Sequence, residues 1–124
     1  MIYGIGTDLC AVERMQKNLQ RPAFVSRVFS AGEQALLDTL PPQRRAQTAA
    51  ANFAAKEAFL KAAGVGLGGF ALAELAVLRR LNGAPYFLLQ GRTAQWTAEN
   101  GLAAHVSLTH ENGLAAAFVV LEQK

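Results

Sequence analysis

The feature that most constrains the fold is a long alanine-rich segment closed by a glycine. From Asn52 to Ala63 the chain consists mostly of alanine and long side chains, which favour an α-helix, and Gly64 stands where a C-terminal cap belongs. The sequence therefore predicts a helix that begins after Pro41-Pro42 and ends at Gly64. Glu57 and Lys61 are four residues apart and share one face of this helix. The spacing fits an ordinary surface ion pair, the commoner case, and it also fits an acid and an amine placed for chemistry.

The segments on either side alternate between helix and strand patterns. Ile2 to Leu9 predicts a buried strand, and its glycines, Gly4 and Gly6, indicate that another part of the backbone approaches closely. Ser30 and Glu33 have the spacing of a capping box and predict a short helix that ends near Leu40. The other expected elements are an amphipathic helix over Val12 to Leu19, interrupted at Arg21-Pro22; a loop over Gly64 to Gly69; a hairpin of Leu72 to Leu81 and Pro85 to Leu89 around Asn82-Gly83; a helix over Thr93 to Asn100; and strands over Ala104 to Thr109 and Leu114 to Leu121.

This order of elements predicts the fold class. Helices dominate the first half and antiparallel strands the second, so we expect an α+β fold with helices packed on one face of a mainly antiparallel sheet. The length of 124 residues fits a single domain, residues 1–124, with its own core. A hydrophobic fraction of 52% against a charged fraction of 17% leaves apolar surface for a subunit interface.

Composition also argues against several functional classes. The single cysteine, Cys10, cannot form an internal disulfide, and the chain has neither a leader-like N-terminus nor an apolar run near the ~20 residues that cross a bilayer. We therefore expect a cytoplasmic protein without membrane contact. The net charge of +3 is a mild excess. Because no basic motif with interleaved aromatic residues accompanies it, nucleic acid is not expected as a partner.

Candidate chemistry centres on two carboxylates. Asp8 ends an apolar strand, where an unpaired carboxylate is costly, and Glu57 lies on the long helix. Two carboxylates from separate elements suit Mg²⁺, whose remaining ligands are water and phosphate oxygens, whereas one cysteine and two histidines cannot form a zinc site. From the residues alone, a turn or cap role after the strand is the slightly commoner case for such an aspartate. Lys61, one turn beyond Glu57, would offset negative charge on a phosphate.

The two histidines near the end of the chain are not expected to act as a pair. His105 and His110 are five residues apart in one strand region, so strand alternation places them on opposite faces. Ser107 shares a face with His105 and could hydrogen-bond a phosphate. A structural role is the commoner case for a strand histidine, and no motif supports Ser107 as a nucleophile.

Three sequence blocks together resemble the holo-acyl-carrier-protein synthase family, the short group of 4'-phosphopantetheinyl transferases. The blocks are Gly4 to Leu9, Phe53 to Ala58 followed by Lys61 and Gly64-Val65-Gly66, and His105 to His110 followed by the apolar Leu114 to Leu121. Their order and spacing span nearly the whole chain. The resemblance implies the fold of this family and a homotrimer with active sites between subunits.

The resemblance also implies a reaction. Coenzyme A binds with its pyrophosphate on Mg²⁺, a serine hydroxyl of apo-acyl carrier protein attacks the β-phosphate, and adenosine 3',5'-bisphosphate leaves. On the matching positions Asp8 and Glu57 would hold the metal, Glu57 would also accept the serine proton, and Lys61 would stabilise the leaving phosphate. The implied coenzyme contacts are Lys61, Gly64, Arg45, His105 and Ser107. The expected docking residues for the acidic carrier are Arg14, Met15, Arg21 and Phe24, although a solvated helix face explains each arginine as well.

Several positions depart from the family pattern. Ala11 stands where the family generally has Glu, Asn52 where it commonly has Arg, Val65 where Thr is usual, and Thr109 where Ser is usual. The missing arginine at Asn52 leaves one coenzyme phosphate without its expected partner, so we expect Arg44 or Arg45 to compensate. Two other functions stay open: another Mg²⁺-dependent transferase acting on a nucleotide diphosphate, and a non-catalytic oligomer that binds the carrier protein or a nucleotide.

Overall fold

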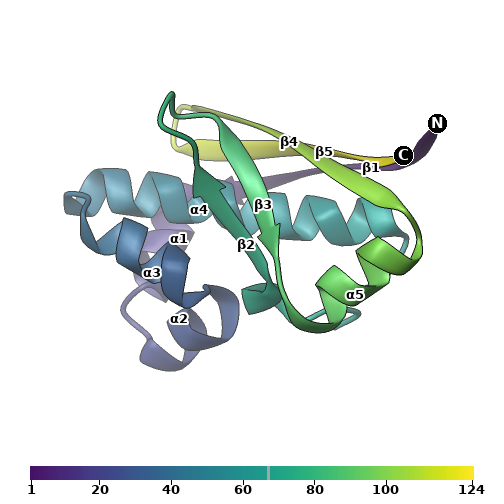
Figure 1. The fold of residues 1–124 in the computed structure, drawn as a ribbon. Coiled ribbons are helices and arrows are strands. Elements are labelled where there is room, and N and C mark those ends of the chain that lie inside the picture. Colours follow the sequence, from purple (N-terminus) through teal and green to yellow (C-terminus); the bar gives the residue numbers. More distant parts are fainter. Residues whose placement is uncertain (67) are drawn as a thin grey trace.

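The alanine-rich segment forms α4 (Pro42–Ala63), a helix of 22 residues that lies beneath the main sheet (Figure 1). It ends as predicted, because Gly64 adopts the left-handed conformation with a φ of 77°. The computed structural model describes residues 1–66 and 68–124. Residue 67 of the predicted glycine-rich loop therefore lies outside the described residues.

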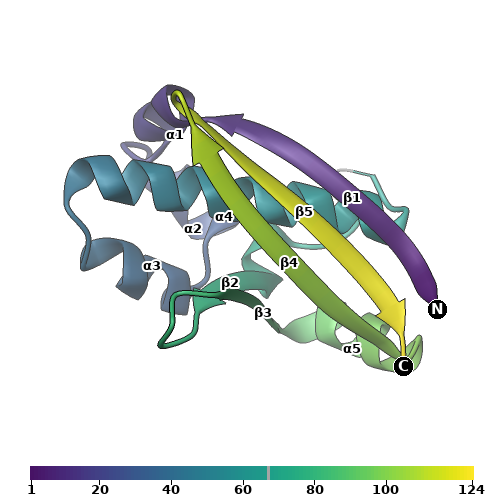
Figure 2. The same cartoon turned by 90° about the horizontal axis from the view of Figure 1, so that it is seen from above.

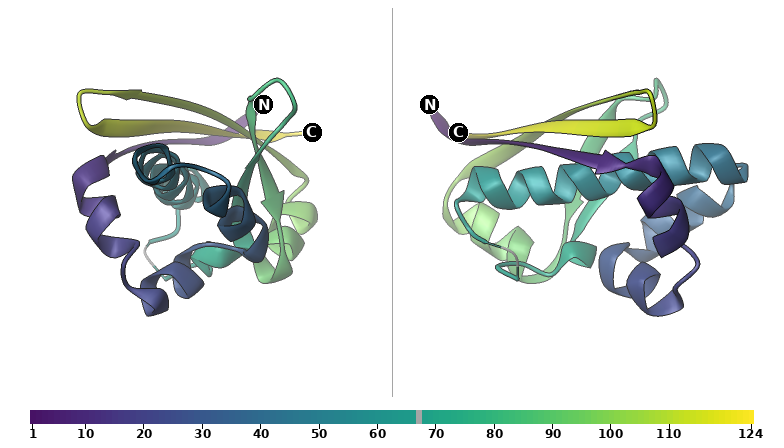
Figure 3. Two further views of the ribbon diagram at one scale, coloured as in Figure 1. Left: turned by 90° about the vertical axis from the view of Figure 1, so that its left-hand side faces the viewer. Right: turned by 180° about the vertical axis from the view of Figure 1, so that it is seen from behind.

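The strands form two antiparallel sheets. A three-stranded sheet has the order β1-β5-β4, and β2 and β3 pair separately. Figures 1 and 3 show the helices on one side of the three-stranded sheet, which agrees with the predicted α+β class. Of the helices that the structure describes, none is long and apolar enough to span a membrane. In chain order the other elements are β1 (Ile2–Ala11), α1 (Val12–Asn18), α2 (Pro22–Val28), α3 (Ala31–Asp38), the 3₁₀ turn η1 (Leu72–Glu74), β2 (Leu75–Arg79), β3 (Pro85–Leu89), α5 (Gly91–Glu99), β4 (Leu102–Glu111) and β5 (Leu114–Gln123).

Two glycines of β1 let α4 approach the sheet. A Cβ atom added at Gly4 would collide with the carbonyl oxygen of Ala62, and one added at Gly6 would collide with that of Ala58. Ala58 is itself completely buried, so small residues line both sides of this contact. The close backbone approach predicted from the two glycines is confirmed. It places the C-terminal half of α4 directly beside β1.

The prediction that β1 is buried is wrong for one of its faces. Gly6 and Cys10 point toward α4 and are buried, but Ile5 and Leu9 on the other side are 57% and 64% exposed. We call this side of the three-stranded sheet the outer face (Figure 3). In the described part of the chain no element covers it, and its exposed apolar side chains include Ile5, Leu9, Leu114 and Phe118.

Several element boundaries differ from the sequence predictions, and the helix α2 was not predicted. Pro22 begins α2, because the fixed φ of proline suits the first position of a helix. The strand expected from Leu72 is shorter at its start, since Leu72–Glu74 forms η1. The predicted hairpin turn is present: Gly83 has a φ of 89°, and the Ala84 amide donates to Asn82 Oδ1 at 3.0 Å.

Candidate active site

A carboxylate site lies where β1 runs past α4, and it consists of Asp8, Glu57 and Lys61. Asp8 is on the same side of β1 as buried Cys10, so it faces α4. Lys61 Nζ donates to Asp8 Oδ1 at 3.2 Å and to the carbonyl oxygen of Thr7 at 3.0 Å. The structure thus gathers at one place the three residues for which catalytic roles were predicted.

Glu57 is coupled electrostatically to its neighbours. Burial raises the pKa of Glu57 above its ordinary value and Asp8 raises it further, whereas Lys61 and Arg14 lower it. The two carboxylates therefore repel each other in the folded chain. A cation bound between them would relieve this repulsion.

The donor set fits Mg²⁺ with open coordination positions. Within residues 1–66 and 68–124, no group of three or more His, Cys, Asp or Glu side chains gathers that could hold a metal ion. Asp8 and Glu57 are two carboxylates, and Mg²⁺ is commonly held by one or two carboxylates together with water and substrate phosphates. The site therefore suits Mg²⁺ better than zinc or calcium, which take more protein ligands.

Two of the four residues expected to dock a carrier protein are buried. Met15 and Phe24 are 1% and 7% exposed and pack in the hydrophobic core, because α1 and α2 turn these side chains inward. The expectation that they anchor a partner at the surface is therefore wrong. Arg14 and Arg21 are exposed. Arg14 is close enough to Glu57 to lower its pKa, so it lies beside the carboxylate site.

His105 and Ser107 lie on the outer face of the sheet, opposite the carboxylate site. In the pairing of β4 with β5, His105 is beside Val120 and Ser107 is beside Phe118, and this side points away from α4. His105 Nε2 is 3.0 Å from Glu122 Oε1, a distance at which a protonated Nε2 donates to the carboxylate. Within a single chain, these two residues and the predicted metal ligands do not meet.

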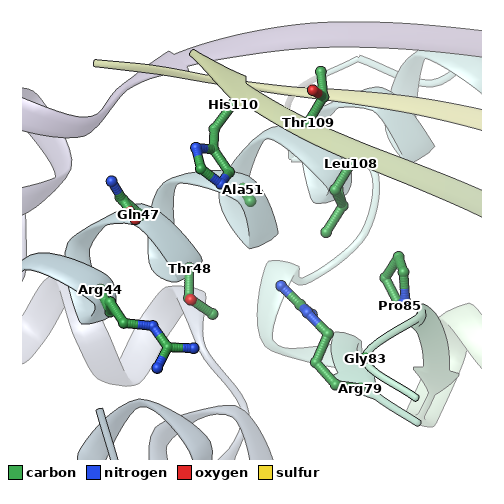
Figure 4. A pocket seen from close by; sticks show the side chains of 10 residues that line it. All are labelled: Arg44, Gln47, Thr48, Ala51, Arg79, Gly83, Pro85, Leu108, Thr109 and His110. Carbon is green, nitrogen blue, oxygen red and sulfur yellow. The ribbon is translucent and has the colours of Figure 1, made fainter. Parts of the chain in front are cut away.

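His110 lies on the inner face, as strand alternation predicts, and lines a second pocket. This hairpin pocket has a volume of about 300 Å³ and lies between α4, the β2–β3 hairpin and the end of β4 (Figure 4). The residues that line it are Arg44, Gln47, Thr48, Ala51, Arg79, Gly83, Pro85, Leu108, Thr109 and His110. Among these residues none is acidic and two are arginines, so the pocket suits an anion.

Arg45, a predicted coenzyme contact, has a structural role instead of lining the hairpin pocket. Its Nε donates to the carbonyl oxygen of Leu37 and its Nη2 to that of Leu40, both at 2.9 Å. These bonds satisfy carbonyl groups at the C-terminal end of α3. Of the two arginines expected to compensate for Asn52, Arg44 is therefore the one that lines the pocket.

The sequence predictions missed a buried polar network that joins α3, α4 and β2. Lys56 Nζ donates to Glu33 Oε1 at 2.6 Å and to two backbone carbonyl oxygens, and both side chains are fully buried. Burial lowers the pKa of Lys56, and Glu33 opposes that effect. Asn52 Nδ2 donates to Glu33, and Arg79 donates to Asn52. One sequence signal could have indicated this network: Lys56 is a charged residue among the alanines that form the buried side of the helix.

Known proteins share both the sequence and the fold of this chain. A sequence model of the 4'-phosphopantetheinyl transferase superfamily matches residues 4–119. The holo-[acyl-carrier-protein] synthase of Variovorax paradoxus is 40% identical over 99% of each chain, and that of Trichlorobacter lovleyi is 43% identical over 98% of each. A solved holo-(acyl-carrier-protein) synthase from Bacillus anthracis, in complex with CoA (3',5'-ADP), has a TM-score of 0.85 at 30% identity and covers 100% of this chain and 99% of its own. The chain therefore belongs to the 4'-phosphopantetheinyl transferase superfamily and, within it, to the holo-[acyl-carrier-protein] synthase family.

Proposed function

We propose that this chain transfers the 4'-phosphopantetheine group of coenzyme A to a serine of an apo-acyl carrier protein and releases adenosine 3',5'-bisphosphate. The observation that carries the proposal is the convergence of Asp8, Glu57 and Lys61 where β1 meets α4. Two acids and an amine at one place are sufficient for a reaction in which positioning and charge neutralisation supply most of the catalysis.

Glu57 is the base in this proposal. Burial, the first cause of its raised pKa, disfavours the ionised form and so makes the carboxylate a better proton acceptor than an ordinary surface glutamate; this cause persists when a cation offsets the repulsion from Asp8. The serine oxygen forms a bond to the β-phosphorus of coenzyme A, and the bond from that phosphorus to the oxygen bridging the two phosphates breaks. The serine proton passes to Glu57, directly or through a water molecule. The bridging oxygen leaves on adenosine 3',5'-bisphosphate.

Lys61 supplies positive charge to the leaving phosphate. Its ammonium group is already held by the Thr7 carbonyl and Asp8, so little reorganisation is needed when charge develops. Asp8 and Glu57 would hold Mg²⁺, which when bound neutralises charge on the diphosphate.

The working unit in this proposal is a homotrimer whose sites lie between subunits. Three features support it: the uncovered apolar outer face, the position of His105 and Ser107 on that face, and the separation of the two sites by α4. Figure 2 shows β1 on one side of α4 and the β2–β3 hairpin on the other. The carboxylate site and the hairpin pocket therefore flank α4 on different sides. A coenzyme molecule that needs both would be shared between two copies.

Carrier docking is assigned to the exposed arginines Arg14 and Arg21. Acyl carrier proteins are strongly acidic, so exposed guanidinium groups suit a charge-steered contact. Arg14 lies beside the carboxylate site, so the carrier would meet the protein next to the groups that react with its serine.

The test is a transfer reaction with the purified chain, coenzyme A, Mg²⁺ and an apo-carrier, followed by mass spectrometry of the carrier. We expect the carrier to gain the mass of one phosphopantetheine and its serine-to-alanine variant to gain nothing. A carrier that binds without changing mass would favour the non-catalytic oligomer. A carrier that gains a different phosphoryl-linked group would favour another nucleotide-diphosphate transferase. Either result would overturn the proposal.

A further inference from the structure

We propose that Arg79 is the residue that binds a phosphomonoester in the hairpin pocket, and that Asn52 holds its guanidinium in position. The identity of the ligand rests on the proposed function. Coenzyme A has one phosphate outside its diphosphate, on the ribose, and this is the group assigned to Arg79. The assignment gives the pocket a guanidinium from β2 in addition to that of Arg44 on α4.

The hydrogen bonds of Asn52 fix the orientation of its amide. Asn52 Nδ2 donates to Glu33 Oε2 at 2.9 Å and to the carbonyl oxygen of Val77 at 3.0 Å. Both hydrogens of the amide nitrogen are thus used, and Oδ1 is left as an acceptor. Arg79 Nη2 donates to this oxygen at 2.8 Å. Because Asn52 is completely buried, it is a rigid support for the guanidinium.

The charge on Arg79 is not cancelled by this support. Its partner is a neutral amide oxygen, and the carboxylate of the same network, Glu33, is already paired with Lys56 at 2.6 Å. Two cations and one anion in the network leave a net positive charge. Burial lowers the pKa of Arg79 and Glu33 opposes that effect, and an arginine in this setting stays charged at neutral pH. A bound anion would offset the cost of keeping that charge half-buried.

The pocket has the lining that a phosphate on a larger ligand requires. Figure 4 shows Arg44, Arg79 and His110 around one space, although they come from α4, β2 and β4. The hydroxyl of Thr48 adds a donor, and Leu108 adds an apolar wall. A volume of about 300 Å³ exceeds that of one phosphate group, so the pocket also has room for part of the group that carries it.

The neighbouring arginine provides a matched control. Arg80 follows Arg79 directly, but its guanidinium carbon lies 4.7 Å from the centre of the Tyr86 ring, and it is not among the residues that line the hairpin pocket. Arg79→Gln and Arg80→Gln therefore remove the same charge from adjacent positions. Only the first removes it from the pocket.

The experiment measures the affinity of each variant by calorimetry for adenosine 3',5'-bisphosphate and for adenosine 5'-monophosphate. The unchanged chain should prefer the bisphosphate. Arg79→Gln should weaken bisphosphate binding roughly 10- to 100-fold, the loss typical of a hydrogen bond to a charged group, and should leave the monophosphate nearly unaffected. Arg80→Gln should keep the preference. Arg79→Lys should restore part of it, because the charge returns without the planar fork.

Moving the guanidinium from position 79 on β2 to position 52 on α4 tests whether either position can supply it to the pocket. The double variant Asn52→Arg with Arg79→Gln should regain the preference for the bisphosphate, and if it does not fold, the comparison of Arg79→Lys with Arg79→Gln decides. An Arg79→Gln variant with an unchanged preference, or an Arg80→Gln variant with an equal loss, would overturn the inference.

The binding measurement is independent of transfer. If the carrier gains phosphopantetheine and Arg79→Gln keeps the preference, only the role of Arg79 fails. If the carrier gains nothing and Arg79→Gln loses the preference, the pocket assignment stands and the proposed reaction fails.

Discussion

Lys61 Nζ lies 3.2 Å from Asp8 Oδ1, although the lysine and the aspartate are 53 positions apart in the chain. The bond crosses from α4 to β1, at a contact made possible by Gly4 and Gly6. The amine is therefore positioned by the fold before any ligand is present. This preset geometry decides what each substitution in the site should do.

The first prediction concerns the two carboxylates. Asp8→Ala or Glu57→Gln should lower transfer to the carrier by roughly 10²- to 10⁴-fold, because each removes a metal ligand and the second also removes the base. Circular dichroism should show an unchanged fold. Glu13→Gln, which removes an exposed acid of α1, is the control and should retain activity. Full transfer by Asp8→Ala or Glu57→Gln at ordinary Mg²⁺ concentrations would contradict the assignment.

The second prediction concerns stability and pH. The pKa of Glu57 is raised in the folded chain above its ordinary value of 4.5, so the folded state binds this proton more tightly than the unfolded state. The contribution of Glu57 to the stability of the unchanged chain should therefore fall as the pH rises from 4.5 through the raised pKa. Glu57→Gln removes this loss. In metal-free buffer, its advantage in urea midpoint should grow across that window and stay constant above it, and an advantage that shrinks with rising pH would argue against the coupling.

The third prediction concerns the contact between β1 and α4. Gly6→Ala should destabilise the chain by about 1–3 kcal/mol or more, because the added methyl group meets the carbonyl oxygen of Ala58. Gly66→Ala is the matched control, since a Cβ atom there has no neighbour within 4 Å, and its effect should stay within about 0.5 kcal/mol. Chemical denaturation measures both. Equal midpoints for the two variants would show that the close approach does not matter for stability.

The fourth prediction separates docking from chemistry. Arg21→Glu should raise the KM for the carrier with a steep dependence on salt and should leave the KM for coenzyme A unchanged. Lys61→Ala should mainly lower kcat, because it removes charge that stabilises the transition state. Arg14→Glu should change both the KM for the carrier and kcat, because Arg14 faces solvent and also lowers the pKa of Glu57. A carrier KM that Arg21→Glu leaves unchanged at low salt would remove the docking role of Arg21.

The fifth prediction concerns assembly. Light scattering should give a mass of about three times 13.2 kDa for the unchanged chain. Phe118→Glu should lower that mass, because Phe118 is an apolar side chain of the uncovered outer face, 46% exposed. Leu81→Glu, at the fully exposed tip of the β2–β3 hairpin, should leave the mass unchanged. An active monomer at micromolar concentration would refute the trimer.

Local signals in the sequence predicted most of the secondary structure. The helix α4 follows from alanine content and its glycine cap, and the helix α3 follows from the capping box, in which Ser30 Oγ accepts from the Glu33 amide. The resemblance also implied that Asp8, Glu57 and Lys61 lie together, as the structure shows, while their catalytic and metal-binding roles stay predictions. These features depend on residues a few positions apart or on short sequence blocks that resemble a family pattern.

Features that depend on three-dimensional packing were not predictable in the same way. Glu33 served the capping box in the sequence prediction, yet it also pairs with Lys56, and no local spacing links residues 23 positions apart. The sequence analysis did not single out Arg79, because its contact with Asn52 joins residues 27 positions apart. Met15 and Phe24 looked like surface anchors, because the sequence does not tell which side of a short helix faces the core.

The pairing of the first strand with the last has a consequence for biosynthesis. Asp8 is held opposite Ala117 of β5, so a chain emerging from the ribosome can complete α4 and still lack the partner that fixes its aspartate. Contacts this distant in sequence form slowly. The chain loses entropy when the long intervening segment is closed, before the strand pairing contributes favourable free energy. The nascent protein should therefore be catalytically silent until residues 114–123 have been made, however early its helices form.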